Sequence, residues 1–447
     1  MRRLSLLALV LITLPAAAQT PAIPPDLVNY VTADDGAFIW KLADTSETPA
    51  GTVYTLDLVS QKWQGVVWDH KLQVIVPKGS SPKATMLLWN QGGAPSANSN
   101  LMAMEIARRV GSPIAFLFGV PKQPLYEGKK EDALIAETFV RFLDTKDSSW
   151  PLLFPMAKSV VKAMDALQAF GKEKLGAEVK QFVVTGASKR GWTSWLTAAT
   201  GDPRVKAIAP MVIDTLNFPK QMPNQLEAFG GKYSEQIVDY EARKLLPLPE
   251  TTDARRLWQM VDPWTYRDKL TLPKLLIHGT NDPYWATDAT NVYWDDLQGP
   301  KCLCYVPNAG HGLRPEETPN VKDGKADAFP TQAINTLAVF ARSQIEDKPL
   351  PKLEWAFTDD DKGLGLFFKS DVQPTAVRAW TTTAETRDFR KSKWTLVPSS
   401  LPVLKTGLLH PGGPPALYKA GLFEVEYELD GQKFSLTTQL RILGPKQ

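Results

Sequence analysis

Cysteine is nearly absent from this chain of 447 residues, and its two cysteines, Cys302 and Cys304, lie two positions apart. They fall in a strand-like run, where both side chains would point to one face and bridging them is geometrically poor. A structural metal site requires more ligands than this pair supplies. We therefore expect neither a disulfide nor a metal site, and a fold that depends on its apolar core.

The chain also lacks a strong net charge and a long apolar run. Its formal net charge of +3 falls to +1 when residues 1–18, which contain two arginines and no acidic residue, are removed. A near-neutral balance gives no indication of nucleic-acid or membrane-surface binding. Beyond residue 18 we expect no membrane span. There is no internal repeat and no cofactor motif, so we expect no cofactor, and the sequence does not indicate an oligomeric state.

The N-terminus has the pattern of an export signal. Arg2 and Arg3 precede an apolar run over residues 4–14, and alanines at 16–18 offer a small-x-small cleavage site. The apolar run is too short to cross a bilayer. We predict that residues 1–18 are a signal peptide and that the mature protein is periplasmic or secreted.

Strand-like and helix-like segments alternate between residues 19 and 346, which predicts an α/β domain with a mostly parallel sheet and flanking helices. Residues 215–265 interrupt this alternation and are predicted to form a cap insertion. Residues 352–447 contain short alternating runs separated by turn signals, which predicts a C-terminal β-sandwich of the immunoglobulin or fibronectin type. The predicted buried strands of the first domain lie at 86–89, 112–119, 182–185, 205–213, 275–279 and 302–306.

Residues 182–192 have the layout of a nucleophile elbow, because an apolar strand pattern leads into a tight turn at Ser188 and a helical segment follows. In the usual Gly-x-Ser-x-Gly pattern a glycine stands two positions after the serine. Here that position is Arg190, and the glycine follows at Gly191. We predict Ser188 as the nucleophile; the alternative is an ordinary helix N-cap serine.

A serine nucleophile needs a base, and histidine is scarce. The four histidines are His70, His278, His311 and His410. Only His311 lies in a glycine-rich loop far downstream of the serine, so we predict it as the general base. The alternative is a loop histidine bonded to the backbone.

The third member of the triad has several candidates. Asp282 follows the buried strand pattern at 275–279 and is the predicted orienting acid. Asp214, after the preceding strand, and Asp288 remain alternatives. The order Ser, Asp, His along the chain is that of an α/β-hydrolase triad.

An oxyanion needs hydrogen-bond donors, and we predict the Lys189 amide and the glycine loop at Gln91 and Gly92; a simple tight turn is the alternative for the loop. The Lys189 and Arg190 cations either bind an acidic substrate or form structural ion pairs. Trp192 and Trp285 are predicted to line a substrate cleft, or else to belong to the core.

These stretches resemble the PhoPQ-activated pathogenicity-related protein family, whose members include bacterial exported proteins and secreted autocrine proliferation repressors of amoebae. The resemblance covers nearly the whole mature chain and implies an α/β-hydrolase-like domain with Ser188, Asp282 and His311 as the triad. A cation after the serine also resembles glucuronoyl esterases. The motifs that carry the resemblance lie at 60–63, 68–70, 74–77, 185–193, 262–264, 281–288 and 305–311.

The sequence thus predicts an exported serine hydrolase that forms an acyl-enzyme, acting on an ester such as a uronate ester or an acidic envelope component. A peptidase acting on short or cationic peptides is one alternative. Another is a non-catalytic signalling or adhesion protein built on a hydrolase scaffold and linked to virulence or antimicrobial-peptide resistance. The expected partner is accordingly a small molecule, an envelope component or a peptide.

Overall fold

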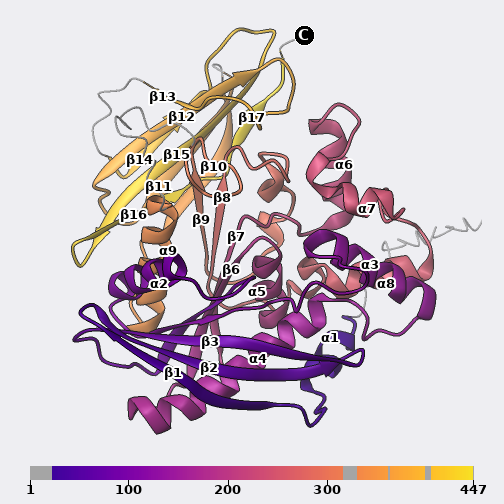
Figure 1. Cartoon of the computed structure of the whole chain (residues 1–447). Helices are drawn as coiled ribbons and strands as arrows, with labels where there is room; N and C mark the ends of the chain where they lie inside the picture. The colour runs from indigo at the N-terminus through magenta and orange to yellow at the C-terminus, as the bar shows by residue number, and fades with distance from the viewer. Residues whose placement is uncertain (1–22, 316–329, 361–362, 398–403, 446–447) are drawn as a thin grey trace, which may run out of the picture.

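The computed structural model describes residues 23–315, 330–360, 363–397 and 404–445, so the predicted signal peptide at 1–18 lies outside the described residues. In this part of the chain nine strands form one sheet in the order β1-β2-β3-β5-β4-β6-β7-β8-β9 (Figure 1). The first four strands of this order, β1, β2, β3 and β5, pair with their neighbours in antiparallel fashion. The remaining pairs, from β5–β4 to β8–β9, are parallel. The strands are β1 (Ile39–Thr48), β2 (Gly51–Trp63), β3 (Val66–Pro77), β4 (Thr85–Asn90), β5 (Ile114–Leu117), β6 (Gln181–Ala187), β7 (Val205–Met211), β8 (Lys274–Gly279) and β9 (Lys301–Val306).

Helices cover both faces of this sheet, which confirms the predicted α/β-hydrolase-like architecture. On β4, Leu87 and Trp89 pack in the same cluster as α2 and α9, whereas Met86 and Leu88 pack in the cluster of α4 and α5. Successive strand residues point to opposite faces, so β4 is buried on both sides. The helices of the sheet domain are α1 (Asp26–Thr32), α2 (Ala97–Val110), α3 (Glu131–Thr145), α4 (Leu153–Phe170), α5 (Lys189–Ala199) and α9 (Thr331–Ile345).

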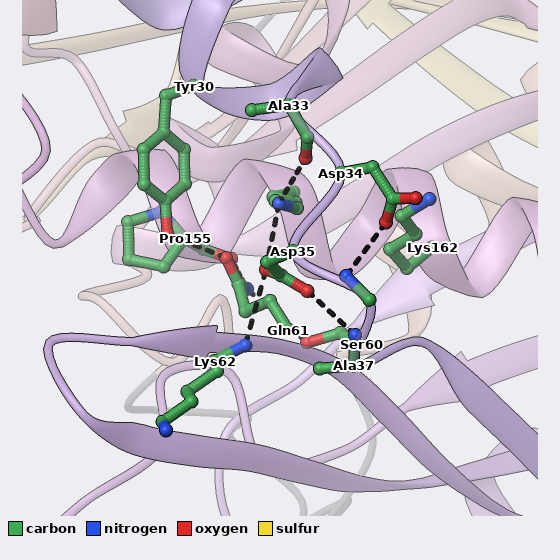
Figure 2. Close-up of polar contacts among 12 residues, drawn as sticks. Tyr30, Ala33, Asp34, Asp35, Ala37, Ser60, Gln61, Lys62, Pro155 and Lys162 are labelled. Atoms are coloured by element: carbon green, nitrogen blue, oxygen red, sulfur yellow. Dashed lines mark hydrogen bonds and ion pairs between the residues drawn. The ribbon is translucent and has the colours of Figure 1, made fainter.

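Helix α1 is fastened to the sheet domain by buried polar contacts. The Tyr30 hydroxyl donates to Gln61 Oε1 at 2.8 Å, and Gln61 Nε2 donates to the Pro155 carbonyl at 2.7 Å (Figure 2). Lys158 on α4 also forms an ion pair with Asp35 at 3.0 Å. None of the helices in the described residues is both long and apolar enough to cross a membrane.

The region between β7 and β8 is helical, where the sequence predicts a cap insertion. These short helices lie on the side of the molecule that carries α3 (Figure 1). They are α6 (Phe218–Ala228), η2 (Glu235–Ile237), α7 (Val238–Ala242), α8 (Thr252–Val261) and η3 (Pro263–Tyr266), and η4 (Ala289–Val292) and η5 (Trp294–Asp296) follow β8.

The C-terminal part of the chain is built of antiparallel strands, as predicted. Two sheets have the orders β10-β11-β14 and β13-β12-β15-β16, with β17 paired to β15. Their facing surfaces meet at Phe368 and Phe423, whose rings lie 4.6 Å apart. The strands are β10 (Leu353–Asp360), β11 (Gly363–Ser370), β12 (Ala376–Ala384), β13 (Thr395–Leu396), β14 (Thr406–Leu409), β15 (Tyr418–Leu429), β16 (Gln432–Thr437) and β17 (Arg441–Leu443).

Both cysteines lie on β9 with free thiols. Burial raises the pKa of Cys302 and of Cys304 to about 12. The thiolate is the reactive form of cysteine, so both thiols stay protonated and unreactive near neutral pH.

Candidate active site

Ser188 stands between β6 and α5 with a strained backbone. Its φ of 58° and ψ of −127° lie in a region that residues with a side chain rarely adopt. The Ser188 amide donates to the Met211 carbonyl at 2.8 Å, and its carbonyl accepts from the Trp192 amide at 3.0 Å. This strand-to-helix turn with strained geometry is typical of a nucleophile elbow.

The displaced glycine of the motif has a packing role. A Cβ atom on Gly191 would lie 2.6 Å from Ile213 Cγ2 and 3.0 Å from the Met211 carbonyl oxygen. A Cβ atom on Gly186 would lie 2.6 Å from the Asn90 amide nitrogen. The close approach of α5 to β7 therefore requires glycine at 191, which leaves position 190 free to carry an arginine.

His311 and Asp282 are in direct contact. His311 Nδ1 lies 2.8 Å from Asp282 Oδ2, and because a carboxylate accepts, Nδ1 carries the proton and Nε2 is the free acceptor of the neutral ring. Asp282 Oδ1 accepts the Tyr284 amide at 2.9 Å. The Tyr284 ring lies 4.3 Å from the imidazole, centroid to centroid. Both carboxylate oxygens are thus engaged, and the imidazole is fixed in orientation.

The two alternative acids have other partners. Asp214 is buried and accepts from the hydroxyls of Thr290 and Tyr293. Burial raises the pKa of its carboxyl group. Asp288 forms an ion pair with Arg387 of the C-terminal domain at 2.6 Å. Of the three carboxylates, Asp282 is the one within hydrogen-bond distance of His311.

Ser188 and His311 border one cavity beneath the helices that follow β7. Its volume is about 40 Å³, room for no more than a few water molecules. The walls that these helices supply are apolar or aromatic. They are Phe218, Met222, Ile237, Tyr240 and Trp258, and Leu246 adds to them from the connection between α7 and α8.

The two tryptophans predicted to line a cleft both border this cavity. Trp192 is buried and donates its indole N–H to the Val261 carbonyl at 2.6 Å. Trp285 is 8% exposed, and its indole nitrogen is buried without a hydrogen-bond partner among the described residues. Trp192 is therefore held by a hydrogen bond within the protein, whereas Trp285 is placed by packing alone.

The two cations beside Ser188 form structural ion pairs. Lys189 Nζ lies 2.7 Å from Asp132, and the Arg190 guanidinium makes two hydrogen bonds of 2.7 Å to Glu131. Arg190 also donates to the Val120 carbonyl at 2.6 Å and does not line the cavity. Burial would raise the pKa of Glu131, but the hydrogen bonds and charge of Arg190 outweigh it and lower that pKa to about 2. Of the two alternatives for these cations, the structure shows the ion pairs, and Lys189 lines the cavity together with its partner Asp132.

Glu131 and Asp132 were not identified from the sequence as parts of this site. They begin α3, which the sequence analysis did not predict. Two acidic residues ahead of an amphipathic run are a recognised signal of a helix N-terminus and indicate where α3 begins. Their pairing with Lys189 and Arg190, far along the chain, follows only from the folded structure.

The predicted oxyanion donors lie on both sides of Ser188. Lys189 is the first residue of α5, where backbone amides lack intrahelical partners. The Gln91 amide donates to the Leu117 carbonyl at 2.7 Å, so it is not free to bind an oxyanion in this structure. Gly92 lies so close to Arg190 that a Cβ atom would be 2.3 Å from its guanidinium nitrogen. Of the two predicted residues in this loop, Gly92 is therefore the one whose backbone amide remains a candidate oxyanion donor.

Comparison with known proteins gives relatives over most of the chain. The family model of the PhoPQ-activated pathogenicity-related protein matches residues 27–390. Autocrine proliferation repressor protein A of Dictyostelium discoideum is 32% identical over 411 residues, which cover 86% of this chain and 79% of that protein.

Solved structures with a similar course of the chain include two acetyl xylan esterases. The enzyme from Paenibacillus sp. R4 is 14% identical with a TM-score of 0.45, over 66% of this chain and 88% of that one. The enzyme from Thermoanaerobacterium sp. JW/SL YS485 is 17% identical with a TM-score of 0.44, over 67% and 91%. By the family match and the Dictyostelium relative, the chain belongs to the PhoPQ-activated pathogenicity-related protein family.

Proposed function

We propose that this protein is an exported serine esterase that works through an acyl-enzyme intermediate. The observation that carries the proposal is that Ser188, at a strained elbow, and His311, bonded to Asp282 at 2.8 Å, border the same cavity. The signal-like pattern at residues 1–18 supports export.

In the proposed reaction Ser188 Oγ attacks the ester carbonyl while its proton passes to His311 Nε2. Asp282 holds the imidazole in the required tautomer and stabilises the imidazolium. The Lys189 amide and the Gly92 amide are the proposed donors to the oxyanion. The intermediate collapses, His311 protonates the departing alcohol, and a water molecule activated by the same histidine then hydrolyses the acyl-enzyme.

For the substrate we propose an ester with a short apolar acyl group in place of the acidic ester expected from the sequence. The cations that suggested an acid are paired with Glu131 and Asp132. The cavity beside Ser188 is walled mostly by apolar and aromatic side chains, its charged lining residues Lys189 and Asp132 are paired with each other, and it has little free volume. An apolar acyl group gains from burial there, and a charged one would have to be desolvated beside a lysine that is already paired.

A second candidate is a secreted signalling protein. The observation that favours it is the 32% identity to a protein named for autocrine repression of proliferation. In that case the hydrolase fold would serve as a scaffold with little turnover.

Labelling of the purified protein with a fluorophosphonate probe separates the two candidates. We expect wild type and Ser99→Ala, which alters a half-buried serine of α2, to be labelled, whereas Ser188→Ala and His311→Ala are not. Circular dichroism checks that each variant is folded. Absence of labelling in folded wild-type protein would overturn the esterase proposal and favour the signalling candidate.

A further inference from the structure

The segment that joins β12 to β13 lies against the loop that carries Asp282. We call residues 386–394 the bridging segment. Asn281, directly before the acid, donates its side-chain N–H groups to the carbonyls of Ser392 at 2.7 Å and Arg390 at 3.2 Å. Its side-chain oxygen accepts from the Thr280 hydroxyl at 2.7 Å. The acid loop is therefore attached to the backbone of the C-terminal domain at the residue next to Asp282.

The same segment also holds the loop that carries His311. Asn308 Nδ2 donates to the Trp394 carbonyl at 2.9 Å, and the Trp394 amide donates back to Asn308 Oδ1 at 2.7 Å. Asn308 has a positive φ of 58° and Trp394 is 1% exposed, so this is a partly buried, two-way contact at a sharp turn. Two asparagines on different loops thus share one partner segment.

The two loops are also joined to each other, but only by a few bonds. The Asn281 amide donates to the Ala309 carbonyl at 3.0 Å, and the Asn308 amide donates to the Thr280 hydroxyl at 2.9 Å. These contacts fix one edge of the pair. The bridging segment adds hydrogen bonds to both loops, so that both are held relative to one common support, whose Phe389 and Trp394 are buried.

Arginines of the bridging segment extend these contacts to the cap. Arg387 pairs with Asp288 at 2.6 Å and with Glu227 of α6 at 3.0 Å. Arg390 pairs with Glu235 at 3.1 Å and packs over the Phe229 ring at 3.7 Å. One stretch of the C-terminal domain therefore contacts the acid loop, the histidine loop and the cap.

We propose that the bridging segment is part of the active-site framework, and that Asn281 and Asn308 are positioning residues that hold Asp282 and His311 at hydrogen-bonding distance through it. The proposal rests on the triad of the proposed function. Catalytic groups must be held within a fraction of an ångström by their supporting residues, and a misplacement of about 1 Å costs on the order of 100-fold in rate. The C-terminal domain accordingly has a role in catalysis besides packing.

The test compares variants of the two asparagines with a matched control in the same domain interface. Asn281→Ala and Asn308→Gly remove the side chains, and glycine at 308 tolerates the positive φ. Asn291→Ala is the control, because Asn291 also exchanges two hydrogen bonds with the C-terminal domain, to the Leu440 carbonyl at 2.9 Å and from Gln439 at 2.8 Å.

Two readouts are measured on full-length folded protein. The first is the rate constant of fluorophosphonate inactivation, expected to fall about tenfold to 100-fold in Asn281→Ala and Asn308→Gly and to stay near wild type in Asn291→Ala. The second is the Nδ1–H proton signal of His311 in protein with ¹⁵N-labelled histidine, where only four histidines contribute and His311→Gln gives the assignment. That signal is expected to broaden through faster exchange in the two test variants only.

The outcomes separate this proposal from the proposed function. If wild type is not labelled, the esterase proposal fails, and the proton signal still decides whether the bridging segment holds the His311–Asp282 contact. If wild type is labelled and all three variants behave alike in both readouts, the segment is only a packing contact and the inference is overturned. Should Asn281→Ala fail to fold, Asn308→Gly carries the same comparison.

Discussion

Asp282 differs from its two rivals in what its carboxylate contacts. One oxygen accepts from His311 and the other from the Tyr284 amide, whereas Asp214 accepts from two hydroxyls and Asp288 pairs with Arg387. An orienting acid acts by fixing the imidazole tautomer. We expect Asp282→Asn to lower kcat for a p-nitrophenyl ester on the order of 10⁴-fold, because asparagine can donate to Nδ1 and favours the wrong tautomer.

Asp214→Asn is the matched control for this prediction. It makes the same change at a buried carboxylate of the same sheet edge, and we expect kcat to stay within about tenfold of wild type while the thermal midpoint falls. The prediction would be contradicted if Asp214→Asn abolished turnover and Asp282→Asn did not. In that case Asp214, which follows β7, would be the orienting acid.

Single residues were predictable where their signal is local. Ser188 follows a strand pattern and precedes a helix, and His311 lies between two glycines, so neighbouring residues were enough to select both as candidates, and the structure places both at one cavity. The ion-pair partners of charged side chains could not be predicted in this way. Nothing near Arg190 in the sequence indicates Glu131, because their contact depends on how α3 and α5 come together. The sequence therefore could not decide between an acidic substrate and structural ion pairs for Lys189 and Arg190, and the acidic substrate stays a prediction that the structure does not test.

In the proposed esterase, the helices between β7 and β8 would limit which acyl groups fit beside Ser188. Their side chains leave a cavity of about 40 Å³, and Met222 of α6 forms part of its wall. We expect wild type to prefer p-nitrophenyl acetate to the octanoate ester. Met222→Ala should shift the ratio of the two kcat/KM values toward octanoate by about tenfold, since one methylene in such a pocket is worth tenfold or more.

The control for the cap prediction is Met156→Ala. Met156 is buried on α4 and does not line the cavity, so this variant loses a similar apolar side chain without enlarging the acyl site. Its acyl preference should match that of wild type. Wild-type protein that already favours octanoate would show that the cap opens in solution, contrary to the prediction.

At the level of elements, strands with strong apolar patterns were identified from sequence and α3 was not. The strands β4 and β8 are buried at every position and have continuous apolar runs at 86–89 and 275–277, which is the signature of a parallel strand covered on both faces. Helix α3 starts after Lys130 without a side-chain cap, so its start lacks the strongest local signal. The attachment of the bridging segment to two distant loops has no local signature at all.

Apolar side chains of the nine-stranded sheet region pack against those of the C-terminal strands. One cluster joins Leu303 of β9 to Leu422 of β15, and another joins Phe340 of α9 to Leu436 of β16. Hydrogen bonds such as that from the Tyr305 amide to Thr437 at 3.0 Å cross the same boundary. Apolar burial is the main source of folding free energy, so the two parts should unfold together.

The stability of this single unit should depend on pH through His70. Burial lowers the pKa of His70 from 6.5 to about 4, while its ring nitrogens bond to the Phe118 carbonyl at 3.1 Å and to Ser60 at 2.9 Å. Between pH 6.5 and 4 the unfolded chain binds a proton at this residue and the folded chain does not, so stability is full above pH 6.5 and declines as the pH falls toward 4.

The full effect of this proton is about 3 kcal/mol, which corresponds to a few degrees in the midpoint of thermal unfolding. His70→Gln keeps hydrogen-bonding capacity without titrating. Calorimetry at pH 7 and pH 4.5 should therefore show one transition in both proteins, with a smaller drop in the midpoint for the variant. Equal drops would show that His70 does not govern this range, and two resolved transitions would show that the apolar packing between the domains is too weak to couple them.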